Sequence, residues 1–153
     1  MRVLTVLLTI SALGDFTLAQ ENKAKSLQLK DLPAAVQKTV QANLNGGEIK
    51  QINKEKEDGI EQYEVETVLN GKSRDFDVDL KGTLLVVEEA TTIEAIPAAA
   101  RAGILKKVAD GKLGEVETFS KPGKPMMYEA SYTDKKGKKH EALFKADGNE
   151  TKE

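Results

Sequence analysis

Four short extended segments, separated by glycine-containing turns, occupy residues 47–89 and constrain the fold more than any other part of the chain. The turns fall at Asp58-Gly59, Asn70-Gly71 and Lys81-Gly82. Asn-Gly and Asp-Gly favour hairpins because a tight turn needs positive φ, which glycine and asparagine adopt at low cost. The stretch is therefore predicted to form an antiparallel meander.

Strict alternation of side-chain character marks two of these segments as strands with one face on a core and the other in water. The positions expected to face the core are Tyr63, Val65, Thr67 and Leu69 in one strand and Phe76, Val78 and Leu80 in the next. Most positions between them are acidic: Glu64, Glu66, Asp75, Asp77 and Asp79. We expect these five carboxylates to form a solvated outer face of the sheet, and they are the candidate partner-binding residues.

One helix is predicted before this meander and a second after it. Pro33 suits the first turn of a helix, where its missing N–H costs nothing. Apolar residues then recur at four-residue intervals, at Val36, Val40 and Leu44. The second helix opens at Pro97 in the same way, and its apolar stripe consists of Ala100, Ile104 and Val108.

The order of features in the first half recurs in the second half. The prolines that open the two helices are 64 residues apart, Tyr63 and Tyr128 are 65 apart, and the glycine turns at Gly71 and Gly137 are 66 apart. Recurrence over a nearly fixed interval is typical of an internal duplication. The predicted fold class is α+β, with two tandem repeats that each consist of one helix packed on a small antiparallel β-sheet meander.

The N-terminus has the pattern of an export signal. Met1-Arg2 precedes an apolar run over residues 3–13, and Thr17-Leu18-Ala19 offers small residues for cleavage before Gln20. The run is shorter than the roughly 20 residues that span a bilayer, so no membrane span is expected after signal removal. A buried N-terminal helix or strand is the alternative. The predicted organisation is a signal peptide over 1–19, a polar leader over 20–30, and repeats over 31–89 and 90–153.

Little in the composition supports catalysis or metal binding. The 153-residue chain has no cysteine, which excludes disulfides, thiolate metal sites and a cysteine nucleophile, and its single histidine is His140. The acidic strand that starts at Asp75 does not continue as a calcium-binding loop, since the positions that need glycine and glutamate hold Leu80 and Val86. No catalytic residue, metal site or cofactor is therefore predicted.

A group of lysines flanks the turn at Gly137, namely Lys135, Lys136, Lys138 and Lys139. Proteins that bind single-stranded nucleic acids combine basic residues with aromatic rings that stack on bases. No aromatic residue is interleaved with these lysines, and the formal net charge of the chain is −2. We interpret the lysines as a solvated hairpin tip, and no nucleic-acid partner is expected.

Several of these features together resemble the PepSY-like family, which is also described as beta-lactamase-inhibitor-like. They are the helix opening at Leu32-Pro33-Ala34-Ala35-Val36, the stop at Gly47, Tyr63-Glu64-Val65, the turns at Gly71 and Gly82, and the strand positions Phe76 and Val78. The resemblance covers about Asp31 to Gly148 as two copies. It implies a helix packed on a small antiparallel sheet in exported bacterial proteins that restrain or chaperone secreted peptidases, or bind other partners. It brings no catalytic residues.

These observations lead to two hypotheses about function. The first is an exported, periplasmic or extracellular binding module without enzymatic activity, which inhibits or regulates a secreted peptidase or another envelope protein. Its partner would be another exported protein. The alternative is an envelope or extracellular sensor that binds a small ligand or a cation between the repeats.

Overall fold

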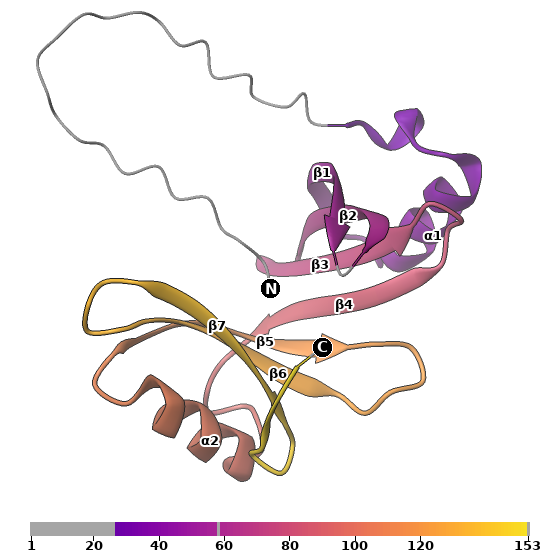
Figure 1. Cartoon of the computed structure of the whole chain (residues 1–153). Helices are drawn as coiled ribbons and strands as arrows, with labels where there is room; N and C mark the ends of the chain where they lie inside the picture. The colour runs from indigo at the N-terminus through magenta and orange to yellow at the C-terminus, as the bar shows by residue number, and fades with distance from the viewer. Residues whose placement is uncertain (1–26, 58, 153) are drawn as a thin grey trace, which may run out of the picture.

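The computed structural model of the chain describes residues 27–57 and 59–152 and contains one antiparallel sheet whose eight strands follow one another in chain order (Figure 1). The strands are β1 (Glu48–Glu57), β2 (Ile60–Leu69), β3 (Lys72–Asp79), β4 (Leu84–Thr91), β5 (Lys112–Ser120), β6 (Met127–Thr133), β7 (Lys139–Lys145) and β8 (Glu150–Thr151). The described residues also form two α-helices, α1 (Ala34–Asn43) and α2 (Ala98–Val108), and a short 3-10 helix spans Leu29–Asp31.

The predicted fold class is wrong. Instead of two helix-plus-sheet repeats, the chain forms a single, mostly β structure, because β4 and β5 pair along five residue pairs from Val87↔Ser120 to Thr91↔Val116. This pairing satisfies the backbone hydrogen bonds that two separate sheets would leave open at their edges. The division of the chain at residue 89 stays a prediction and falls within β4. The signal peptide over 1–19 lies outside the described residues.

The antiparallel meander itself is confirmed, and its alternating positions face the core as expected. Tyr63, Val65, Phe76 and Val78 are buried against α1, whose Val36 and Val40 are fully enclosed. Figure 1 shows α1 beside β3 and α2 against β5, β6 and β7 at the far end of the sheet. A second core lies under α2, formed by Ala100, Ile104, Val108, Val116, Tyr128, Ala130, Ala142 and Phe144 with Ile96.

Both helices begin after a proline, and a tight glycine turn lies against the first turn of each. Pro33 and Pro97 precede α1 and α2, with φ near −55° in both. At Gly82, where φ is +89°, a Cβ atom would lie 2.8 Å from the Ala35 carbonyl group. At Gly148, where φ is +86°, a Cβ atom would lie even closer to the Ala99 carbonyl group in α2. Glycine at these turns therefore allows the helix to approach the sheet, as well as supplying positive φ.

Both helices lie on the same face of the sheet. Phe76, which packs under α1, pairs with Val87 on β4, and Val87 pairs with Ser120 on β5. Val116 lies four residues before Ser120 on β5, so it faces the same way, and it packs under α2. Side chains alternate between the two faces of a strand. The strand positions that lie between these core-facing residues therefore point to the opposite side of the sheet, which neither helix covers.

Candidate functional site

The candidate site is this uncovered side of the sheet, here called the open face. Its side chains come from β1 to β7. The acidic ones are Glu55, Glu57, Glu64, Glu66, Asp75, Asp77, Asp79, Glu88, Glu117, Glu129 and Glu141. The others include Asn53, Gln62, Val68, Ser73, Val86, Ala90, Phe119, Met127, Ser131, Thr133, Lys139, Leu143 and Lys145. The two lysines both belong to β7. The open face therefore concentrates negative charge from both halves of the chain on one surface.

An apolar cluster is buried at the centre of the open face. Val86, Phe119 and Leu143 come from β4, β5 and β7, and Phe119 is 1% exposed. Leu85 and Met127 pack against them. Side chains from non-neighbouring strands pack together here without a helix above them. The open face therefore has an apolar centre between acidic strands.

Carboxylates oppose one another directly across neighbouring strands of the open face. The paired positions are Glu64↔Asp77 between β2 and β3, Asp75↔Glu88 between β3 and β4, and Glu117↔Glu129 between β5 and β6. Like charges placed opposite one another in a sheet reduce its stability. Five of these six carboxylates, Glu64, Asp77, Glu88, Glu117 and Glu129, also take part in further interactions with other groups of the chain.

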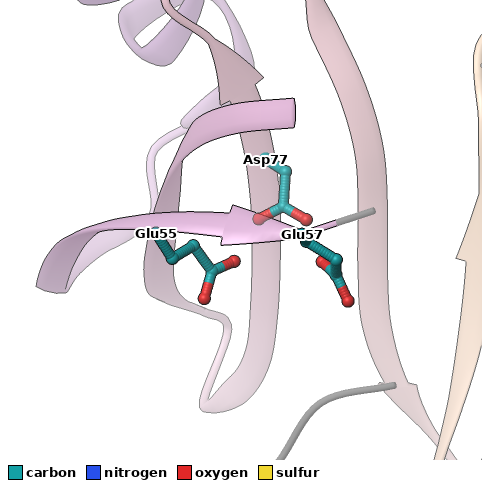
Figure 2. Close-up of side chains that lie close together, drawn as sticks. All are labelled: Glu55, Glu57 and Asp77. Atoms are coloured by element: carbon teal, nitrogen blue, oxygen red, sulfur yellow. The ribbon is translucent and has the colours of Figure 1, made fainter. Parts of the chain in front are cut away.

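Three carboxylates of the open face, those of Glu55, Glu57 and Asp77, approach one another from β1 and β3 (Figure 2). One oxygen from each lies within 4.8 Å of the others. The Gln62 amide lies between the two glutamates and donates hydrogen bonds to Glu55 Oε1 and Glu57 Oε2, each at 3.1 Å. Carboxylate oxygens are ligands that hard cations prefer. In this structure the Gln62 amide donates hydrogen bonds to two of the three carboxylates.

Each of the five candidate residues lies on the open face, as expected, but they differ in accessibility. Glu64 and Glu66 are half-buried beside Asn53, whose Nδ2 lies 3.4 and 3.3 Å from their carboxylates. Asp75 is also half-buried and accepts hydrogen bonds from the Thr67 backbone N–H at 2.9 Å and from Ser73 Oγ at 3.0 Å.

The expectation that the whole acidic row is solvated is wrong for Asp77, which is 3% exposed. Carboxylate oxygens of Glu55 and Glu57 on β1 lie within 4.8 Å of a carboxylate oxygen of Asp77. The alternation of the strand therefore predicts the face of Asp77 correctly but not its burial. Asp79 has a local role in the β3–β4 turn, where its Oδ1 accepts the backbone N–H groups of Lys81 and Thr83, both at 2.8 Å. The Thr83 N–H is the main cause that lowers the pKa of Asp79.

Two open depressions lie near the β4–β5 pairing, on the helix side, where the alternative hypothesis places a small ligand. They have volumes of about 290 and 360 Å³. The larger one is lined partly by Arg74, which bonds to Glu89 Oε1 at 3.0 Å through Nε and to the Asn43 carbonyl at 2.6 Å through Nη1. Arg74 thus joins the end of α1 to the sheet, so its contacts have a structural role.

This fold is shared with solved proteins from Bacteroides. A protein from Bacteroides eggerthii that is proposed to be periplasmic superposes with a TM-score of 0.64 at 16% identity, covering 79% of this chain and 86% of its own. A DUF2874 family protein from Bacteroides ovatus gives 0.61 at 13%, covering 79% and 85%. A BLIP-like protein from Bacteroides fragilis gives 0.58 at 17%, covering 79% and 84%. These likenesses agree with the beta-lactamase-inhibitor-like part of the expected resemblance.

Other comparisons add no relatives. No protein-family model matches the chain, and no curated protein matches it by sequence. Over residues 27–57 and 59–152, no helix is long and apolar enough to cross a membrane.

Sequence reasoning missed much of the open face, chiefly Glu55, Glu57, Glu88, Glu117 and Phe119. In β1 the carboxylates alternate with Lys54 and Lys56, so the segment reads as a mixed polar strand, with no acidic face apparent. Glu88 and Phe119 lie opposite one another only because β4 pairs with β5. That pairing joins segments about 30 residues apart in the chain, and no short-range sequence pattern predicts it.

Proposed function

We propose that this chain is an exported binding module, without enzymatic activity, that holds another exported protein against its open face. The observation that carries the proposal is the open face itself, a sheet surface that neither helix covers, with an apolar centre among carboxylates. Protein recognition typically relies on a few buried anchors within a polar surround, presented by a rigid scaffold. The BLIP-like and proposed periplasmic neighbours are consistent with this function.

The proposed contact residues are those singled out by the sequence, with roles adjusted to their burial. Glu64, Glu66 and Asp75 are accessible enough to meet a partner directly. Asp77 is buried beside Glu55 and Glu57 and is not available for direct contact, and Asp79 lies at the end of the row. A row of this kind steers a positively charged partner toward the face and raises its association rate.

The effect on the partner would be steric. A face that covers the active site or the docking surface of a secreted peptidase, or of another envelope protein, inhibits or regulates it without chemistry. The PepSY-like part of the resemblance, which rests on the sequence motifs alone, supports this kind of role. Export would follow from cleavage after Ala19, which leaves a polar leader before the described structure.

Charge reversal on the open face tests the proposal. The mature protein is used to capture its partner from the secreted fraction, and association of the identified partner is then measured with Glu64→Lys/Glu66→Lys at two ionic strengths. The matched control is Glu94→Lys/Asp110→Lys, which reverses two exposed carboxylates flanking α2. We expect the open-face variant alone to associate more slowly and to depend less on salt.

Equal association rates and equal salt dependence in all three proteins would contradict a contact at these residues. A protein that captures no polypeptide, and is instead stabilised against heat by calcium or a small molecule, would favour the sensor hypothesis, since a ligand stabilises the state that it binds.

A further inference from the structure

We propose that the hairpin between β6 and β7 holds the protein against a membrane surface that is rich in anionic phospholipids. The proposal goes beyond the proposed function and does not depend on it. It rests on five exposed lysines that the fold brings to one end of the sheet, here called the lysine end. They are Lys112, Lys135, Lys136, Lys138 and Lys139.

Strand pairing gathers the lysine end from separate parts of the chain. Thr133 on β6 pairs with Lys112 on one side and with Lys139 on the other, at the base of the hairpin. The other three lysines lie in the hairpin turn, where Gly137 has φ of +82°. The turn after α2 lies against the same place, since a Cβ atom at Gly111 would be 2.6 Å from the Thr133 carbonyl oxygen (Figure 1).

The charges of the lysine end are exposed and are not paired with carboxylates. Within residues 27–57 and 59–152, no ion pair involves any of its five ammonium groups. Asp134, in the hairpin turn, uses its carboxylate to accept the Lys136 and Lys138 backbone N–H groups and to contact His140 Nε2 at 2.9 Å. Asp110 is exposed in the turn after α2. Five lysines therefore face two aspartates, and the lysine end keeps a net positive charge.

The chemistry of the lysine end favours an extended anionic surface over a single anionic group. Lysine is a strongly hydrated point charge on a flexible stem, and it lacks the planar fork with which arginine fixes a carboxylate or a phosphate. The turn from Asp134 to Lys138 has no apolar or aromatic side chain that would insert into a pocket or stack on a base. Clusters of about four to eight basic residues are typical of segments that bind anionic lipid headgroups.

The position of the lysine end is compatible with the proposed function. The hairpin turn lies where β6 ends and β7 begins, so these strands would run away from a membrane that the turn contacts. Glu64 and Glu66 are on β2, which three strands separate from β6. These carboxylates would therefore stay away from the anionic surface that repels them, and a partner would still reach the open face.

Co-sedimentation of the mature protein, residues 20–153, with lipid vesicles tests the proposal. The vesicles consist of phosphatidylcholine alone or of phosphatidylcholine mixed with phosphatidylglycerol, and binding is measured at low and high ionic strength. The hairpin variant is Lys135→Gln/Lys136→Gln/Lys138→Gln/Lys139→Gln. The matched control, Lys30→Gln/Lys38→Gln/Lys56→Gln/Lys124→Gln, changes four exposed lysines elsewhere and has the same net charge.

We expect the natural protein and the control variant to bind the vesicles that contain phosphatidylglycerol, and to leave those of phosphatidylcholine alone unbound. High ionic strength should weaken this binding, because salt screens exposed charges. Each lysine near an anionic bilayer strengthens binding by about fivefold, so the hairpin variant should no longer sediment with the vesicles. Equal melting temperatures of the three proteins would show that this loss is not a loss of fold.

The proposal is overturned if the natural protein binds neither kind of vesicle or binds both equally. It is also overturned if the two variants lose binding equally, since that result would reflect net charge alone. Displacement of the protein from the vesicles by glycerol phosphate at constant ionic strength would assign the lysine end to single phosphate groups instead. A protein partner that needs the hairpin lysines, without any binding to vesicles, would place an acidic protein there in place of a membrane.

Discussion

At the scale of single residues, the structure gives several acidic side chains different roles that their sequence positions do not distinguish. Asp77 and Asp79 are two residues apart on one strand, yet the first is buried close to carboxylates of β1 and the second accepts backbone hydrogen bonds in a turn. Alternation predicts which face a side chain takes, and it did so correctly for both. Burial and hydrogen bonding depend on what neighbouring strands bring above that face, which is set by pairing.

Asp134 supports a prediction about pH at this scale. Its Oδ2 lies 2.9 Å from His140 Nε2, and its Oδ1 accepts the backbone N–H groups of Lys136 and Lys138 at 2.8 and 3.0 Å. The His140 hydrogen bond, followed by that from Lys138, lowers the pKa of Asp134 to about 2. Because the folded-state pKa lies below the unfolded value, the carboxylate stabilises the fold above its unfolded pKa, near 3.9, and this contribution is lost as pH falls toward 2.

Asp134→Asn removes this pH-dependent contribution to stability. We expect the melting temperature of the variant to lie below that of the natural chain at pH 5, and the difference to shrink as pH falls from 4 toward 2, in thermal scans monitored by circular dichroism. Asp110→Asn, at an exposed position after α2, serves as the control and should show no such convergence. A difference that stays constant across this pH range would show that the Asp134 contacts do not contribute to stability.

At the scale of elements, the two helices and the strands around Tyr63 and Phe76 could be predicted from the sequence, because each has a short-range period and a proline or glycine at its ends. The pairing of β4 with β5 could not. β4 and β5 are separated in the chain by α2, and each would have an unpaired edge if the two halves formed separate sheets. The local sequence pattern of each strand is compatible with either one sheet or two. The misassigned fold class and the missed residues of the open face, Glu88 and Phe119 among them, share this cause.

Arg74 gives a prediction for the attachment of α1 to the sheet. Its guanidinium bonds to the Asn43 carbonyl at the end of the helix and to Glu89 on β4, and it lies 5.6 Å from the Phe76 ring centre. Arg74→Ala leaves that carbonyl without its side-chain donor and should lower the free energy of unfolding by about 2–3 kcal/mol in urea titrations.

Arg74→Lys should recover only part of this loss, since lysine has no planar fork with which to reach both partners. Arg101→Ala on α2, which is half-buried, is the matched control and should change stability by less than about 0.5 kcal/mol. Equal effects at the two arginines would mean that Arg74 does not join the helix to the sheet.

At the scale of the whole molecule, one continuous sheet separates two surfaces of different character. Both helices cover one side and enclose two apolar cores, while the other side gathers carboxylates around the Val86, Phe119 and Leu143 cluster. Merging the strands into one sheet also makes the open face longer than either half could offer alone. The proposed function therefore depends on the same β4–β5 pairing that overturned the predicted fold class.

The central claim, that a partner occupies the open face and leaves the helix side free, can be measured by thiol labelling. The chain has no cysteine, so single cysteines report on one position each. Glu66→Cys and Ser131→Cys sample the open face on β2 and β6, and Ala98→Cys and Ala102→Cys sample the exposed side of α2. We predict that bound partner slows labelling at residues 66 and 131 and leaves labelling at residues 98 and 102 unchanged. Slower labelling at the two helix positions, with residues 66 and 131 unaffected, would contradict the account.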